Sequence, residues 1–317
     1  MVKINHVSLT MSKKIKGLLL LLGLGAIWGS SFMFMKWGMM PRKGFHVLSY
    51  TQVASMRILV ASLVLLPFSL PSIRLLFSEK GKYFLIVGLC GSLIPSFLFT
   101  YANTAMSGGL SGILNSVTPI FTVIIGFVFF LTAIHWIQLV GIFVSTFGVI
   151  FLLFSGEIFN YNLNASHFTS VLCATLMYGI SVNTIKHKLT EISPLLVSAL
   201  GLASILPVAL AVFIQQGTLH PLLHQTYGAE AFLYVFILGF VGTAIANIYF
   251  NKLIQLTSAL FASSVTYLIP FFAVLLGSLN HEKFTWIQFL AMIILLSGVC
   301  LVNFHELLLK KWRILKY

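Results

Sequence analysis

The chain repeats itself at a spacing of about 150 residues, which limits it to folds built from two similar halves. The segment Trp28–Lys36 recurs in altered form as Tyr178–Lys186, with an aromatic residue, a glycine, a serine and a lysine in register. Other matching pairs keep the same order: Trp136–Gln138 with Trp286–Gln288, Gly148 with Gly298, Pro119 with Pro270, and Tyr101–Asn103 with Tyr249–Asn251. We therefore expect two homologous halves that differ mainly in their loops.

Composition excludes a water-soluble domain. Hydrophobic residues make up 59% of the chain and charged residues 8%, with a mean hydropathy of +1.02, so polar side chains could not cover a water-facing surface. A membrane span needs about 20 mostly apolar residues. The sequence predicts ten spans: 17–37, 48–70, 83–105, 109–131, 136–155, 167–187, 194–215, 231–253, 257–279 and 286–305. They divide the chain into a tail (1–16), a first repeat (17–155), a second repeat (167–305) and a basic tail (306–317).

Basic residues predict the orientation. With the N-terminus inside, fourteen of the nineteen lysines and arginines fall on the cytoplasmic side, four fall outside, and Arg57 lies within a span. This excess predicts a multi-pass protein of the cell (inner) membrane with both termini in the cytoplasm. Because five spans are an odd number, the second half must run upside down. The expected fold class is all-α integral membrane, with ten transmembrane helices as two inverted five-helix repeats.

Several short motifs resemble one known family. They are W-G-S-S-F at 28–32, Arg57 in R-I-L-V-A, Pro119 in the fourth span, Tyr178-Gly179, Pro270 and Glu282. In this order, over about residues 17–305, the chain resembles the EamA-type permeases of the drug/metabolite transporter superfamily. The resemblance implies a central cavity lined chiefly by helices 1, 3 and 4 and their repeats 6, 8 and 9. The chain departs from the family where a glutamate usually follows the fourth helix, at residues 131–136, so a role for a symmetric glutamate pair is in doubt.

Polar residues form stripes on several predicted spans. Thr243, Asn247 and Asn251, for example, recur every four residues on one helix face. Unpaired polar groups are costly in lipid, so such faces must look inward, either to a substrate or to neighbouring helices through hydrogen bonds. Trp28 and Tyr178 lie too deep for an interfacial belt, and helix packing is the alternative to a cavity role for them. The predicted substrate-binding residues are Trp28, Ser31, Asn103, Asn115, Tyr178, Asn183, Asn247, Asn251 and Thr266.

The charges near the membrane favour an anionic substrate. The chain has no aspartate, and its six glutamates fall at or outside the ends of the predicted spans, so no buried acid is available to hold a cation or a proton. The predicted charged or gating residues are instead the cations Lys36, Arg57 and Lys186. The two lysines lie at opposite ends of equivalent helices, where attraction of an anionic solute and snorkelling to lipid headgroups are both open.

These features predict a secondary transporter that exports small organic metabolites, such as amino acids or related carboxylates, by alternating access at a central cavity. Outward direction follows from the family resemblance alone. Within the same superfamily the alternative is a multidrug or lipophilic-compound exporter. Gly109–Gly112 also matches the G-x-S-G of rhomboid-like intramembrane serine proteases, but the sequence offers no mid-membrane histidine to activate the serine. A channel is a third class.

Few partners are expected. Cys90, Cys173 and Cys300 stand singly in three different spans, so the sequence predicts no metal site, and no cofactor is expected. The net charge of +13 is explained by membrane topology and requires no nucleic acid. The expected partners are the small-molecule substrate and the lipid bilayer, with a homodimer left open.

Overall fold

The computed structural model describes residues 2–154, 165–270, 272, 285–287, 289–294, 296–298, 300 and 301. Within these residues the regular structure is helical, apart from an isolated bridge between Arg42 and Phe45. The first half contains α1 (Val2–Met39), α2 (Tyr50–Ser69), η1 (Leu70–Phe77), α3 (Gly81–Gly88), η2 (Leu89–Leu93), α4 (Ile94–Ala102), α5 (Gly108–Asn115), α6 (Thr118–Phe130) and α7 (Trp136–Phe154). The second contains α8 (Ala165–Lys188), α9 (Pro194–Gln215), α10 (Leu219–His224), α11 (Gly228–Gly239), η4 (Phe240–Ile245), α12 (Ala246–Leu256), α13 (Ala259–Ser263) and η5 (Ser264–Tyr267).

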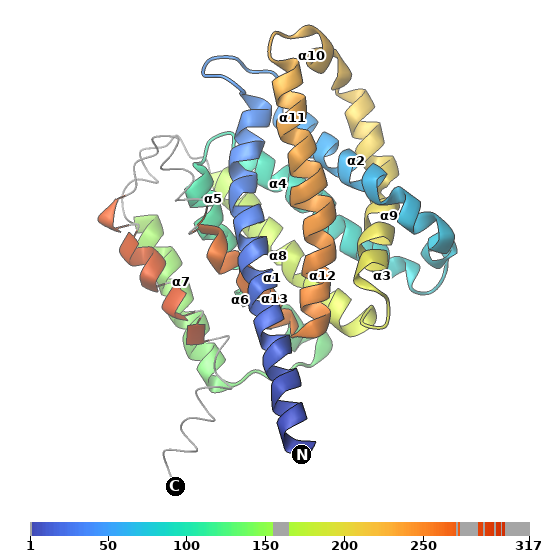
Figure 1. Cartoon of the computed structure of the whole chain (residues 1–317). Coiled ribbons are helices and arrows are strands. Elements are labelled where there is room, and N and C mark those ends of the chain that lie inside the picture. Colours follow the sequence, from blue (N-terminus) through green and yellow to red (C-terminus); the bar gives the residue numbers. More distant parts are fainter. Residues whose placement is uncertain are drawn as a thin grey trace.

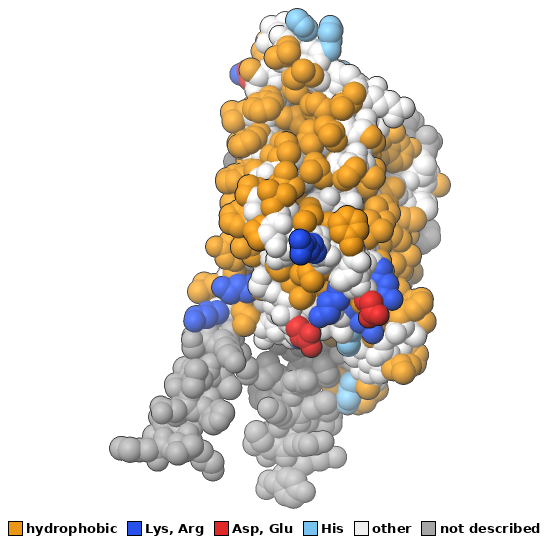
Figure 2. All heavy atoms as spheres, turned by 90° about the vertical axis from the view of Figure 1, so that its right-hand side faces the viewer, with side chains coloured by type: hydrophobic (Ala, Val, Ile, Leu, Met, Phe, Trp, Pro, Cys, Tyr) orange, Lys and Arg blue, Asp and Glu red, His pale blue; other side chains and the backbone are white. Residues whose placement is uncertain are grey.

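Seven helical stretches among the described residues are long and apolar enough to cross a membrane. They are Lys16–Met39, Tyr50–Phe77, Gly81–Ala102, Gly108–Phe130, Ala165–Lys188, Pro194–Gln215 and Gly228–Leu256. At the other three predicted spans, the described residues form shorter apolar helices, Trp136–Gly148, Ala259–Pro270 and Phe289–Gly298. Figure 2 shows one face on which hydrophobic side chains cover most of the height, while charged side chains gather toward the lower end. The chain is thus an integral membrane protein that crosses the bilayer several times.

The helices mix the two halves of the sequence. α2 of the first half packs along α9 of the second, toward the right-hand edge of Figure 1. α1 packs against α11 and α12, and α8 packs against α4 and α6. We call these the α1 group (α1, α11, η4, α12, α13, η5) and the α8 group (α8, α3, η2, α4, α5, α6). Each group combines the helices that correspond to those of the other.

Glycines allow equivalent helices to approach closely in both halves. A Cβ atom added at Gly88 of α3 would lie 2.3 Å from the carbonyl oxygen of Gly201 in α9. A Cβ atom at Gly239 of α11 would lie 2.8 Å from the carbonyl oxygen of Arg57 in α2. Any side chain here would force the helices apart. These glycines therefore set how closely α3 packs on α9 and α11 packs on α2.

The third span of each half contains a π-helical turn. The turns η2 and η4 begin at Leu89 and Phe240, which are 151 residues apart. This spacing aligns Gly91-Ser92 with Gly242-Thr243 and Thr100 with Asn251. The register suggested by the matching tyrosines, which pairs Asn103 with Asn251, is therefore wrong by three residues. π-helical turns are uncommon and often mark functional sites.

Serine caps start equivalent helices. Ser49 accepts a hydrogen bond from the backbone of Gln52 at the start of α2, and Ser193 does the same for Leu196 at the start of α9. Because Arg57 and Gly201 each lie eight residues after their cap, they occupy corresponding positions. The only cation predicted inside a span thus has a glycine as its counterpart.

Candidate substrate cavity

A cavity with an empty volume of about 990 Å³ lies between the α1 and α8 groups. Helices of both groups line it, as the resemblance implied, and α2 and α9 contribute as well. Eight of the twelve predicted site residues are in its wall: Trp28, Ser31, Arg57, Asn115, Tyr178, Asn247, Asn251 and Thr266.

An indole forms one wall of the cavity. Trp28 packs edge-on against Phe250, with 4.9 Å between ring centroids. Its Nε1 atom donates a hydrogen bond of 3.0 Å to the carbonyl oxygen of Gly242, in the π-helical turn η4. Ser31, one turn further along α1, approaches the same turn, because a Cβ atom at Gly242 would lie 3.0 Å from its hydroxyl oxygen. These contacts fix α1 and the indole on η4.

The α8 group supplies the corresponding wall. Tyr178 stacks on Phe99, with 5.8 Å between ring centroids and 23° between ring planes. Ser181 lies close to the π-helical turn η2, since a Cβ atom at Gly91 would lie 2.5 Å from its hydroxyl oxygen. Tyr178, Phe99, Ser181 and Gly91 correspond by spacing to Trp28, Phe250, Ser31 and Gly242.

Arg57 brings a positive charge to the wall. It lies seven residues after the start of α2, about 10 Å along the helix axis, and is 8% exposed. Its Nε atom donates to the hydroxyl of Thr243 at 2.7 Å, and that hydroxyl donates to the carbonyl of Leu238 at 3.2 Å. Among the described residues neither Nη atom has a hydrogen-bond partner, and no carboxylate lines the cavity.

Several hydrogen bonds join the two sides of the cavity. The amide of Asn247 donates to the hydroxyl of Ser92 at 3.1 Å, linking η2 to α12. The hydroxyl of Ser116 donates to the carbonyl of Thr266 at 3.1 Å, linking the fourth span to η5. Asn251 donates to the hydroxyl of Ser198 on α9 at 2.8 Å. The first two bonds hold the α1 group and the α8 group together, and the third holds α12 on α9.

Four predicted site residues lie outside the cavity wall. Asn183 donates to the carbonyls of Thr122 and Gly179, both at 2.9 Å, and so joins α8 to α6. Asn103 accepts a hydrogen bond of 2.8 Å from Ser111 and packs its amide on the sulfur of Met35. The hydroxyl of Ser111 is thus directed to an asparagine in the described structure, rather than to a histidine as the protease alternative requires.

The remaining two are lysines at helix ends. Lys186 donates to the carbonyls of Ile254 at 3.2 Å and Thr257 at 2.6 Å, at the C-terminal end of α12. Lys36 lies half-buried in the last turn of α1. The sequence left two roles open for both lysines, a cation at a mouth of the cavity and snorkelling to headgroups; in the structure Lys186 joins α8 to α12.

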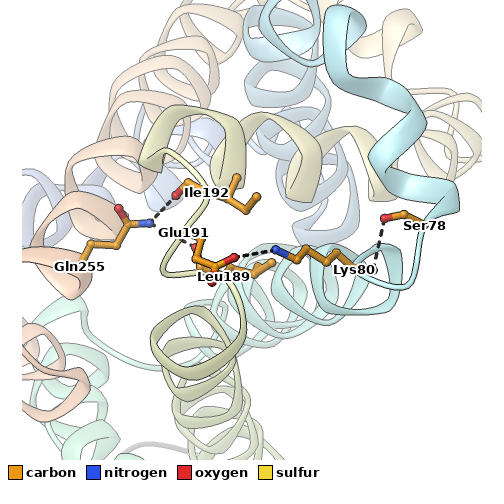
Figure 3. A network of polar contacts seen from close by, with 6 residues as sticks. All are labelled: Ser78, Lys80, Leu189, Glu191, Ile192 and Gln255. Atoms are coloured by element: carbon orange, nitrogen blue, oxygen red, sulfur yellow. Dashed lines mark hydrogen bonds and ion pairs between the residues drawn. The ribbon is translucent and has the colours of Figure 1, made fainter.

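Further polar contacts lie at the same end as Lys186 (Figure 3). Lys80, before α3, forms a 3.1 Å ion pair with Glu191 in the loop after α8. Gln255 of α12 donates to the carbonyl of Ile192 in the same loop at 2.7 Å. At the opposite end Arg42 pairs with Glu230 at 3.3 Å, and the hydrogen bond that Arg42 donates to Glu230 raises the pKa of this arginine. Each ion pair joins the loop after the first span of one half to the start of the third span of the other half. In one pair the loop carries the acid, Glu191, and in the other pair the loop carries the base, Arg42.

Sequence reasoning missed part of the wall. Phe99, Phe250 and Ser198 line the cavity, as do Gly201 and Leu202 of α9. The signal for the two phenylalanines was present, because the 151-residue spacing that joins Pro119 to Pro270 also joins Phe99 to Phe250. The contribution of α9 had no such signal, since Ser198 is the one polar residue among the three that α9 contributes to the wall.

Comparison with known proteins identifies the class. The model of the EamA-like transporter family matches the chain twice, at residues 15–154 and 167–304. The chain therefore belongs to the EamA-like transporter family and is a multi-pass membrane transporter. A solved crystal structure, whose title names no function, is similar with a TM-score of 0.59 and 12% sequence identity, covering 92% of this chain and 96% of that one. That likeness shows the fold alone. No curated protein sequence matches the chain.

Proposed function

We propose that this protein is a secondary transporter that exports small organic carboxylates, amino acids among them, by alternating access of the central cavity. In this proposal the chain crosses the membrane ten times, as two inverted five-helix repeats, with both termini in the cytoplasm. The observation that carries the substrate class is Arg57, a buried cation in the wall whose Nη atoms have no partner among the described residues.

A cation in a low-dielectric cavity favours an anionic ligand and disfavours a cationic one. A planar guanidinium can bind a carboxylate through two parallel hydrogen bonds. In Arg57 Nε already donates to Thr243, and the two Nη atoms can donate one or two hydrogen bonds to a carboxylate. The amide and hydroxyl groups of Asn115, Asn247 and Thr266 offer further hydrogen bonds to an amino group or a second polar group of the substrate.

Contacts on both sides of the cavity support alternating access. Phe32 of α1 packs against Phe99 of α4, with 5.8 Å between ring centroids, and so joins the α1 group to the α8 group. Toward the other end, Lys186 joins them through α12. A carrier must open one such closure while the other holds.

The proposal is tested by transport into proteoliposomes that contain the purified protein. Radiolabelled L-alanine, L-glutamate, L-phenylalanine and succinate would be supplied with and without a pH gradient, and protein-free liposomes serve as the control. We expect saturable flux of at least one carboxylate and no competition by tetraethylammonium. Flux of none of these solutes, or competition by tetraethylammonium, would overturn the carboxylate assignment, and the latter would indicate a drug exporter.

A further inference from the structure

Two aromatic pairs line the cavity, each with one residue from either half of the sequence, and carboxylate binding by Arg57 does not require either pair. The pairs are Trp28 with Phe250 and Tyr178 with Phe99. All four side chains line the cavity. Both centroid distances, 4.9 and 5.8 Å, lie in the range in which aromatic rings attract each other.

Three of these four rings are more exposed than core residues. Phe99 is 4% exposed, whereas Trp28, Tyr178 and Phe250 are half-buried although they lie deep within their spans. Their uncovered surface therefore borders the cavity. The indole is also held in place by its hydrogen bond to Gly242, so little side-chain entropy remains to be lost when a ligand packs on it.

The indole and the guanidinium are anchored side by side. Trp28 donates to the carbonyl of Gly242, and Arg57 donates to the hydroxyl of the next residue, Thr243. Both belong to the π-helical turn η4. A carboxylate bound to Arg57 therefore places the atoms that follow it beside the indole.

We propose that the preferred substrate is a carboxylate that carries an aromatic ring on a short linker. The carboxylate binds the Nη atoms of Arg57, and the ring packs between Trp28 and Tyr178. This inference rests on the proposed function and specifies the substrate of the same cavity. Ring–ring contacts contribute beyond the burial of apolar area, so an aromatic ring binds more tightly than a saturated ring of similar size.

The test uses the full-length protein in proteoliposomes and uptake of radiolabelled L-phenylalanine. Unlabelled L-phenylalanine, L-cyclohexylalanine and L-alanine compete, so that the first two compare an aromatic with a saturated ring. We expect the half-inhibitory concentration of L-phenylalanine to be about three- to tenfold lower than that of L-cyclohexylalanine. The variants Trp28→Leu and Tyr178→Leu should each reduce this ratio, while inhibition by L-alanine stays within about twofold.

Two further variants keep the test decisive. Phe236→Leu is the matched control, because Phe236 stacks on Phe232 at 5.9 Å outside the cavity wall, and its ratio should be that of the unmodified protein. Phe250→Leu alters the same aromatic pair but retains the indole hydrogen bond, and replaces Trp28→Leu if that variant does not fold.

Equal competition by the two ring compounds, or a ratio that persists in all cavity variants, overturns the inference. Flux of short carboxylates without ring preference contradicts this inference alone, whereas flux of no carboxylate contradicts the proposed function.

Discussion

At the scale of single residues, the cavity departs from the symmetry of the two halves at Arg57. Its counterpart in α9 is Gly201, so a charge stands on one side where the other has no side chain. Arg57 lines the cavity, and the hydroxyl of Thr243 holds its guanidinium through Nε. We expect a symmetric scaffold with one asymmetric charge to bind a polar substrate in a single orientation.

Replacement of this charge should weaken binding of anions selectively. We expect Arg57→Gln to raise the KM for an anionic substrate about tenfold, the loss of an interaction of about 1.4 kcal/mol, with a smaller effect on a neutral solute. Arg57→Lys should recover part of the loss, because an ammonium keeps the charge but not the planar donors. Initial rates of uptake would measure both. Lys82→Gln, at an exposed position, is the control, and equal changes for charged and neutral solutes would argue against the electrostatic role.

Two asparagines that look alike in the sequence should behave differently. Asn103 accepts a buried hydrogen bond from Ser111, so Asn103→Ala leaves that hydroxyl unpaired and should lower stability by about 1–3 kcal/mol. Asn247 is half-buried in the cavity wall, so Asn247→Ala should reduce flux more than it lowers the melting temperature. Flux and melting temperature would be measured on the same preparations. Parallel losses in Asn247→Ala would assign this residue to packing.

The difference between these asparagines also shows what the sequence could not predict. Periodicity placed both on inward faces, but a face is inward whether it meets a cavity or another helix. The structure shows which: Asn103 lies at the end of α4 against Ser111 and Met35, whereas Asn247 lies at the start of α12 in the cavity wall. The 150-residue repeat and their depth in the spans favoured Trp28 and Tyr178 as cavity residues, and both line the cavity.

At the scale of elements, the C-terminal end of α12 is held by α8. The last carbonyls of a helix lack partners within it, and Lys186 supplies an ammonium to those of Ile254 and Thr257. The negative end of the helix dipole strengthens this contact. Because α8 and α12 belong to different groups, the contact must break if the cavity is to open at this end.

Removal of the ammonium should therefore favour opening at the end where Lys186 lies. In a cysteine-free background, Ser198→Cys in the wall would report access through its rate of labelling by a membrane-impermeant maleimide applied from that side. We expect Lys186→Gln to raise this rate roughly tenfold, since hydrogen bonds to a charged group contribute about 1.5 kcal/mol or more. Lys188→Gln, exposed two residues further on, is the control. An unchanged rate in Lys186→Gln would show that the lysine does not hold the closure.

At the scale of the whole molecule, the exchange of helices between halves explains why the sequence predicted the units but not their assembly. The repeat defines two homologous stretches, and the family model matches each of them. In space, α1 packs with α11 and α12, while α8 packs with α4 and α6. Such partners follow from glycine contacts far apart in the sequence, such as Gly38 of α1 with Val235 of α11, for which periodicity gives no signal.

The proposed membrane topology is tested by placing single cysteines at the two ends of the molecule. Tyr227 precedes α11 and Ser78 precedes α3, the corresponding helix of the other half. If the halves are inverted, these positions must face opposite sides of the membrane. The excess of lysine and arginine predicts Ser78 in the cytoplasm and Tyr227 outside. In intact cells a membrane-impermeant maleimide should label Tyr227→Cys, and Ser78→Cys should react only after permeabilisation. Labelling of both in intact cells, or of neither, would show that the two halves run in the same direction.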